Sequence, residues 1–217
     1  MNKRNTIPLI LSTILIGLIF IFSIFRLNDL SIWHGKAINF DIVISGIYIV
    51  WMIFELKISK EELFKGDKTS DFGTCELYAI GQAGVLLSAL WFHSFWTVPN
   101  IFHIFGLIFF ISGIIFRIWA ITTLGRYYSH IVRKVEEHKI IDSGPYHHIR
   151  HPAYAGMILA NTGITIFFFN TAIVLFFFLV LLPAIIARIL IEEKTLFKIE
   201  GYAKFAKSKK RLVPVIW

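Results

Sequence analysis

The densest group of residues able to do chemistry runs from Gly144 to Tyr154, with the sequence GPYHHIRHPAY. Gly-Pro makes a tight turn, and Pro152 suits the first turn of a helix, where its missing N–H costs nothing. The unpaired N–H groups and the positive dipole end of that helix could hold a carboxylate, with Arg150 and His151 as further donors. The alternative is an interfacial anchor, with Tyr at the lipid headgroups and Arg and His facing lipid phosphate.

A second group closes the last apolar stretch of the chain and consists of Arg188, Glu192 and Glu193. Arg188 and Glu192 are four residues apart on one helix face, so a simple ion pair is one interpretation. Ionisable groups at membrane depth are otherwise candidates for function. On that interpretation one glutamate holds the ammonium of a cofactor and Arg188 orients an anionic acceptor.

The histidines of the first group also raise the question of a metal site. His147, His148 and His151 lie on one short segment, and membrane di-iron enzymes use several such histidine boxes. The other histidines are scattered along the chain, so no second box is present in the sequence. We therefore predict no metal.

The amino-acid composition indicates whether the helices that carry these residues lie in water or in a membrane. Of the 217 residues 56% are hydrophobic and only 17% are charged, whereas a soluble domain carries about 25% charged residues. No linker or internal repeat divides the chain, so we expect a single integral membrane domain over residues 1–217. The net charge of +8 falls between apolar runs, which indicates a membrane protein rather than a nucleic-acid-binding one. The single cysteine, Cys75, is uninformative about redox compartment.

The apolar runs predict an all-α, polytopic transmembrane bundle of about six spans. A helix needs about 20 apolar residues to cross a bilayer. The first run exceeds the apolar core of a signal peptide and is expected to be a retained helix. The runs are Ile7 to Phe25, Ala37 to Phe54, Leu77 to Phe116 with a break at Pro99-Asn100, and His151 to Ala187 with a turn at Asn170-Thr171.

Orientation follows from the Lys and Arg residues in the connections. With the N-terminus inside, twenty of these residues lie on inner segments, and only Arg26 and Lys36 lie outside. This predicts N-in and C-in topology and places both chemical groups on the cytoplasmic face. Residues 1–116 would form four N-terminal spans. Residues 117–217 would form the catalytic half, with a polar loop, a helical hairpin and an amphipathic C-terminal extension.

The C-terminal half resembles the isoprenylcysteine carboxyl methyltransferase family and the related phospholipid N-methyltransferases. The resemblance covers roughly Ile118 to Pro214 and rests on several motifs in the same order. They are Leu124 to Ser129 (LGRYYS), His138 to Ile141 (HKII), Gly144 to Tyr154, Arg188 with Glu192-Glu193 and Leu196, Gly201-Tyr202, and Arg211 to Pro214 (RLVP). The sequence departs from the family pattern at Phe205, where relatives often have tyrosine.

The resemblance implies S-adenosylmethionine as cofactor, in a cytoplasm-facing pocket closed by the loop around His138 and by the C-terminal segment. The residues implied to bind it are His138, Gly144, Tyr146, Arg150, His151, Pro152, Tyr154, Glu193, Leu212 and Pro214. Arg188 and Glu192 would be the catalytic residues nearest the acceptor. The implied reaction is carboxyl methylation of an isoprenylcysteine-like or other lipid-like acceptor that enters laterally from the bilayer lipids.

Three alternatives remain beside this prediction. The acceptor could instead be a phospholipid or small molecule methylated on nitrogen, sulfur or oxygen, which for an amine or phenol would require a base such as His147, His148 or Glu192. An NADPH-dependent reductase of the sterol-reductase type shares the Arg-His-Pro-x-Tyr element but not the Arg188 to Glu193 pattern. A non-enzymatic binding or transport protein would need a polar path, and the spans offer little beyond Asp41.

Overall fold

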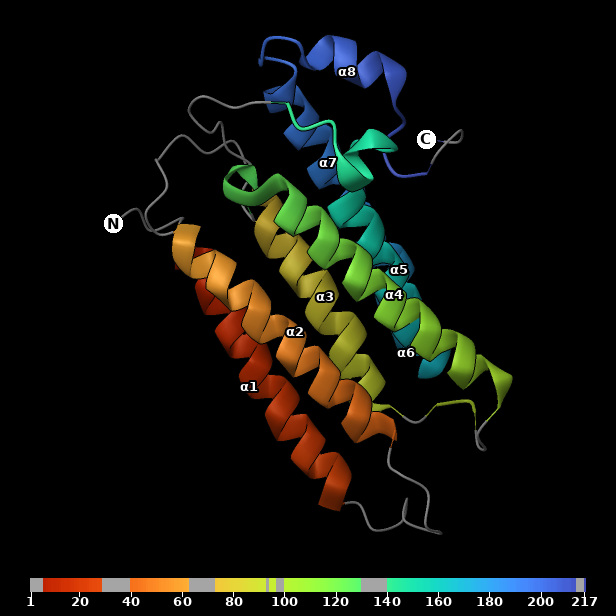
Figure 1. The fold of residues 1–217 in the computed structure, drawn as a ribbon. Coiled ribbons are helices and arrows are strands. Elements are labelled where there is room, and N and C mark those ends of the chain that lie inside the picture. The colour runs from red at the N-terminus through yellow and green to blue at the C-terminus, as the bar shows by residue number, and fades with distance from the viewer. Residues whose placement is uncertain are drawn as a thin grey trace.

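The fold is a bundle of helices (Figure 1). The computed structural model describes residues 6–28, 40–62, 73–92, 94–96, 100–129, 140–213 and 217. Within these residues every regular element is a helix, which confirms the predicted all-α class. The α-helices are α1 (Ile7–Asn28), α2 (Phe40–Glu62), α3 (Thr74–Trp91), α4 (Ile101–Leu124), α5 (Pro152–Phe167), α6 (Thr171–Phe176), α7 (Leu182–Leu196) and α8 (Tyr202–Ser208). Three short elements complete the list: η3 (Gly125–Tyr127), η4 (Gly144–His147) and the π-helical η5 (Phe177–Leu181).

Two of the described helices are long and apolar enough to cross a membrane. They are Ile101–Tyr127 and Thr171–Leu196, and Leu9–Ile24 is a shorter apolar helix. The number of six spans and their orientation therefore stay predictions.

The predicted breaks within the two long apolar regions are present. The side chain of Asn100 accepts from the N–H of Phe102 and caps the start of α4. Asn170 caps α6 in the same way, with Oδ1 accepting from Ile173 at 3.0 Å. Asparagine is a favoured N-cap because its side chain satisfies an N–H that the helix leaves unpaired. Each region thus forms two helices.

Helix α4 runs further than the predicted span. The prediction ended at Phe116 because Arg117 is charged, but the helix continues to Leu124. Arg117 is only 3% exposed and its guanidinium pairs with the carboxylate of Glu55 on α2. A charge that is neutralised inside the bundle does not have to end an apolar helix.

Helices α4 and α5 pack backbone against backbone. A Cβ added to Gly113 of α4 would lie 2.3 Å from the amide nitrogen of Ala160, and one added to Gly163 of α5 would lie 2.3 Å from that of Phe110. Small residues at such crossings let membrane helices approach closely. This contact fixes α5, which carries the chemical group at its start, against α4.

The helix from Thr171 to Leu196 has an irregular middle. Its π-helical part, η5, ends two residues before Pro183, which lies in the first turn of α7. Proline lacks an N–H and its ring crowds the carbonyl four residues earlier, so a wider turn at that point relieves the clash. Helix α3 packs directly on this stretch, because a Cβ on Gly81 would lie 2.8 Å from the Cα of Leu181.

The two chemical groups lie at one end of the bundle. Figure 1 shows η4, the end of α7 and α8 gathered there. The C-terminal segment is bound to the start of α5, since the N–H groups of Arg150 and His151 donate to the carbonyls of Lys210 and Arg211 at 2.8 and 2.9 Å.

Candidate functional site

The carboxylate of Glu193 joins the two groups that the sequence singles out. Its Oε1 pairs with the Arg150 guanidinium at 2.7 Å and lies 3.3 Å from Nε2 of His151. Its Oε2 accepts from Nε of Arg211 at 2.8 Å. Glu193 is only 3% exposed, and a buried carboxylate requires such partners. The predicted proximity of α7 and the start of α5 is therefore present.

The start of α5 is built as the sequence predicts, with one difference. Pro152 occupies the first turn and His151 is the N-cap. The N–H of His151 is already taken by the carbonyl of Arg211, so this amide does not face a ligand. Gly144 has a φ of 55° and opens η4. This is the left-handed region that favours glycine, so Gly144 shapes the turn.

A polar cavity lies next to this helix start and has an empty volume of about 870 Å³. Five of the predicted site residues line it, namely Tyr146, Arg150, His151, Tyr154 and Glu192. Leu212 is 9% exposed and its N–H donates to the carbonyl of Trp217 at 2.8 Å. His138 and Pro214 lie outside the described residues.

The polar cavity has aromatic walls that our site prediction left out. Tyr127, Tyr128 and Tyr202 line it, together with Phe205, the departure from the family pattern. All three tyrosines lie in motifs on which the family resemblance rests, so the sequence did contain a signal that could have identified them. Burial raises the pKa of the Tyr146 and Tyr202 phenols, and nearby glutamates raise both further. Both phenols are therefore neutral at physiological pH.

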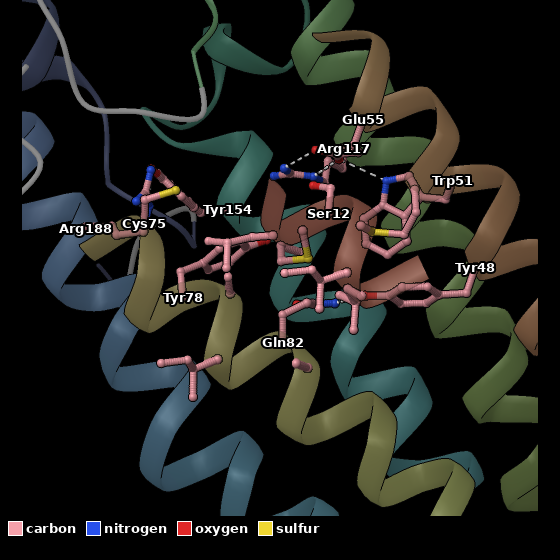
Figure 2. Close-up of a pocket in the computed structure, with 18 of the residues that line it drawn as sticks. Ser12, Tyr48, Trp51, Glu55, Cys75, Tyr78, Gln82, Arg117, Tyr154 and Arg188 are labelled. Atoms are coloured by element: carbon pink, nitrogen blue, oxygen red, sulfur yellow. Dashed lines mark hydrogen bonds and ion pairs between the residues drawn. The ribbon is translucent and has the colours of Figure 1, made fainter. Parts of the chain in front are cut away.

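A larger, apolar cavity lies between α1, α2, α3 and the C-terminal helices, with an empty volume of about 1020 Å³. Its walls are mostly aliphatic and aromatic, with Glu55, Arg117 and Arg188 among its polar residues (Figure 2). Three residues line both cavities, namely Tyr128, Ser129 and Tyr154. The polar and apolar cavities thus meet at these three side chains.

Arg188 lies on the apolar side of this junction. Its Nε donates to the Tyr154 hydroxyl at 3.3 Å and its Nη1 to Oγ1 of Thr74 at 3.4 Å. Its guanidinium also lies 5.6 Å from the ring centre of Tyr78, which is a cation–π distance. Glu192, one turn further along α7, lines the polar cavity instead. The two predicted catalytic residues therefore belong to different cavities.

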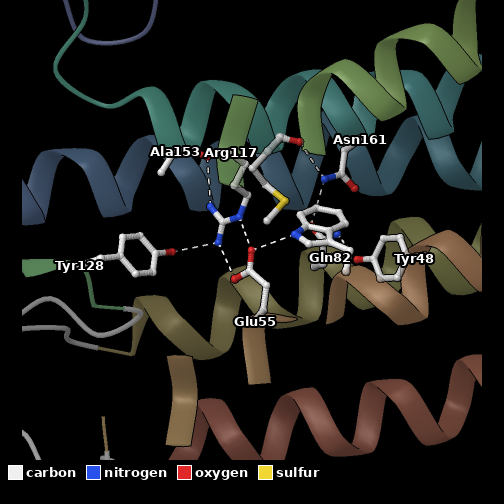
Figure 3. A network of polar contacts seen from close by, with 9 residues as sticks. Tyr48, Glu55, Gln82, Arg117, Tyr128, Ala153 and Asn161 are labelled. Carbon is white, nitrogen blue, oxygen red and sulfur yellow. Dashed lines mark hydrogen bonds and ion pairs between the residues drawn. The ribbon is translucent and has the colours of Figure 1, made fainter. Parts of the chain in front are cut away.

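A buried ion pair between Glu55 and Arg117 was not predicted from the sequence (Figure 3). Nη2 of Arg117 donates to Oε2 of Glu55 at 2.9 Å and to the Tyr128 hydroxyl at 3.0 Å. Nη1 donates to the carbonyl of Ala153 at 3.1 Å, and Trp51 donates to Glu55 at 3.0 Å. The network joins α2 to the first turn of α5 and to the junction of the cavities.

The three histidines considered as metal ligands have different surroundings. His147 is 67% exposed in its side chain and lies 3.3 Å from Asp142, whereas His151 is buried against Glu193. Among the described residues no three His, Cys, Asp or Glu side chains are placed to hold a metal ion.

Comparison with known proteins agrees with the motifs. Residues 106–198 match the model of the isoprenylcysteine carboxyl methyltransferase family. The predicted family resemblance is confirmed. The matched segment holds most of the polar cavity, with Tyr202 and Phe205 beyond its end.

Relatives of the chain are named as isoprenylcysteine methyltransferases. Protein-S-isoprenylcysteine O-methyltransferase B of Arabidopsis thaliana is 32% identical over 125 residues, and isoform A is 33% identical over 125 residues; each match covers 56% of this chain and 61% of the relative. A probable protein-S-isoprenylcysteine O-methyltransferase of Oryza sativa subsp. indica is 31% identical over 126 residues, with 56% and 64% covered. The match therefore spans less than two thirds of each relative's length.

Proposed function

We propose that this protein is a membrane-embedded methyltransferase that uses S-adenosylmethionine to methylate the carboxylate of an isoprenylcysteine-like or other lipid-like acceptor. The observation that carries the proposal is the junction of a polar and an apolar cavity at Tyr128, Ser129 and Tyr154. A polar cofactor and a lipophilic acceptor would meet there. The names of the relatives support the reaction type.

The polar cavity suits the cofactor in the chemistry of its lining. Arg150 lines this cavity, and its guanidinium, held by Glu193, would attract the carboxylate of a bound amino acid. Glu192 offers a carboxylate to the cofactor's cationic groups, and Tyr146, Tyr202 and Phe205 offer aromatic surface to its adenine. Glu193 would act by holding Arg150 and His151 in place.

The main task of the protein in this reaction would be to position the two reactants. When bound, S-adenosylmethionine supplies a methyl group already activated on a sulfonium. Arg188 would hold the acceptor carboxylate so that one oxygen faces this methyl. Because a carboxylate acceptor carries no proton at neutral pH, no residue would have to act as a base. Tyr154, which accepts from Nε of Arg188, would orient the guanidinium at the junction.

We also propose the topology that this chemistry requires. The chain would be one membrane domain with six spans, and both termini and the polar cavity would face the cytoplasm. The distribution of Lys and Arg supports this orientation, and Ile101–Tyr127 and Thr171–Leu196 supply two helices of sufficient length. The acceptor would reach the apolar cavity laterally from the bilayer.

Transfer of labelled methyl from S-adenosylmethionine tests the proposal. The purified chain in lipid nanodiscs is given N-acetyl-S-farnesylcysteine or a total lipid extract, and the labelled product is treated with base. We expect a base-labile product, and we expect Arg188→Lys to lower kcat/KM because lysine lacks the planar fork that holds a carboxylate. A base-stable product would reject carboxyl methylation, and no labelled product at all would reject the methyltransferase.

A further inference from the structure

One face of α3 carries polar groups along the wall of the apolar cavity. Thr74, Tyr78 and Gln82 follow one another at intervals of four residues, which corresponds to about 6 Å along a helix for each step. Arg188 donates to Thr74 and lies over the ring of Tyr78. Tyr78 and Gln82 line the apolar cavity. This face therefore leads from the arginine down into the apolar interior.

The deeper end of this face is a buried hydrogen-bonded chain. Gln82 donates to the hydroxyl of Tyr48 on α2, and Asn161 on α5 donates to Oε1 of Gln82 at 3.1 Å. Tyr48 lines the cavity as well, and its hydroxyl hydrogen is not used in the bond that it accepts. Oδ1 of Asn161 is buried with no hydrogen-bond partner among the described residues.

The Tyr78 hydroxyl is the group that points to a ligand. Figure 2 shows Tyr78 reaching into the cavity between Arg188 on one side and Gln82 and Tyr48 on the other. Its oxygen is buried, and no described residue makes a hydrogen bond to it. A buried hydroxyl without a partner costs free energy, and phenylalanine would fill the same space without that cost.

Hydrogen bonding between helices explains some of the polar side chains along this face of α3, but not Tyr78. Polar side chains often join membrane helices, and the bonds from Tyr48 to Gln82 and from Gln82 to Asn161 connect α2, α3 and α5 in this way. Tyr78 bonds to no described residue, so its hydroxyl joins no helices there.

We propose that the acceptor carries a hydroxyl or keto oxygen in the middle of its lipophilic chain, bound by the Tyr78 hydroxyl. The proposal rests on the proposed function, because it places the acceptor carboxylate at Arg188. Tyr78 and Gln82 lie one and two helical turns from Thr74, about 6 and 12 Å along the axis. The oxygen is thus well separated from the carboxylate, and a plain hydrocarbon chain leaves the Tyr78 hydroxyl without a partner among the described residues.

Displacement of a fluorescent fatty acid, cis-parinaric acid, from the protein in nanodiscs tests this without requiring catalysis. The competitors are hexadecanoate and its monohydroxy isomers, with the hydroxyl moved along the chain. We expect a mid-chain isomer to displace the probe at a concentration at least tenfold lower than hexadecanoate. The 2-hydroxy and 16-hydroxy isomers should gain nothing.

The variants distinguish a ligand contact from a structural role. Tyr78→Phe removes a hydroxyl that bonds no described residue, so we expect unchanged thermal stability and loss of the mid-chain preference. Ser88→Ala removes another hydroxyl of α3, outside the cavity, and should keep the preference. Equal displacement by all the acids, failure of the probe to bind, or a preference that survives Tyr78→Phe would overturn the inference.

Methyl transfer to the same acids tests the reaction separately from the oxygen-binding subsite proposed at Tyr78. A mid-chain preference in displacement without any labelled ester supports the subsite and rejects the carboxyl methylation. Labelled ester from every acid at equal kcat/KM, together with equal displacement, supports the methylation and rejects the subsite.

Discussion

The two cavities are built by different parts of the chain. The lining of the polar cavity comes from residues 124–205, most of which lie in the segment that matches the family model. Most of the apolar lining comes from α1, α2 and α3, which precede residue 106, where the match begins. Most of the polar-cavity lining therefore lies inside the segment that matches the family model, whereas most of the apolar-cavity lining lies outside it.

The largest expected effect comes from breaking the ion pair that joins these regions. Glu55→Ala leaves Arg117 charged and buried, and removing one partner of a buried ion pair costs about 3–5 kcal/mol. We expect a lower thermal unfolding temperature in detergent. The double variant Glu55→Leu/Arg117→Met should recover part of the loss, because it leaves no buried charge unpaired. An unchanged unfolding temperature in Glu55→Ala would mean that the pair does not hold the regions together.

A change at Glu193 should affect the polar cavity alone. Glu193→Gln keeps the shape of the side chain but removes the charge that pairs with Arg150 and Arg211. Hydrogen bonds to charged groups contribute about 1.5–3 kcal/mol, so calorimetry should show S-adenosylhomocysteine binding weakened by about tenfold or more. Displacement of cis-parinaric acid should be unchanged. A loss in both assays would contradict the separation of the cavities.

The contact between α4 and α5 should be sensitive to one methyl group. In Gly113→Ala the new Cβ meets the backbone of Ala160, and overpacking of this kind costs about 1–3 kcal/mol. Gly17→Ala on α1 is the matched control, because a Cβ there has no described atom within 4 Å. We expect a lower unfolding temperature for the first variant only. Equal temperatures would show that the helices can separate without cost.

The smallest effect concerns pH. The folded protein raises the pKa of Tyr146, so above the ordinary tyrosine value of about 10 the unfolded chain loses this proton before the folded one does. The contribution to stability is fully present below about pH 10 and declines above it. We expect Tyr146→Phe to flatten the decline of unfolding temperature between about pH 9.5 and 11. A decline that is identical in the variant would assign it to other groups.

Local sequence signals predicted a good part of this architecture. The asparagine caps at Asn100 and Asn170 and the proline at the start of α5 act within one helical turn, so their sequence is sufficient to place them. The two chemical groups were also recognisable, since each is a compact motif. The resemblance assigned Arg150, His151 and Glu193 to one pocket, and in the structure these three side chains are in contact.

Other features depend on partners that are distant in sequence. Glu55 and Arg117 are 62 residues apart, and neither residue alone reveals that it is neutralised by the other. The end of α4 was misplaced for that reason. The unpartnered hydroxyl of Tyr78 was likewise not predicted, because in the sequence a tyrosine in an apolar run resembles an ordinary core residue.

The π-helical stretch η5 sets the rotation of everything that follows it in α7. A π turn accommodates one more residue than an α turn, so it acts as a single-residue insertion within the helix from Thr171 to Leu196. Each α-helical residue turns the axis by about 100°. Deleting one residue of Phe177–Leu181 would therefore restore a regular helix and leave Arg188 and Glu193 facing their present partners, whereas the same residues forced into α turns would rotate both side chains away by about 100°.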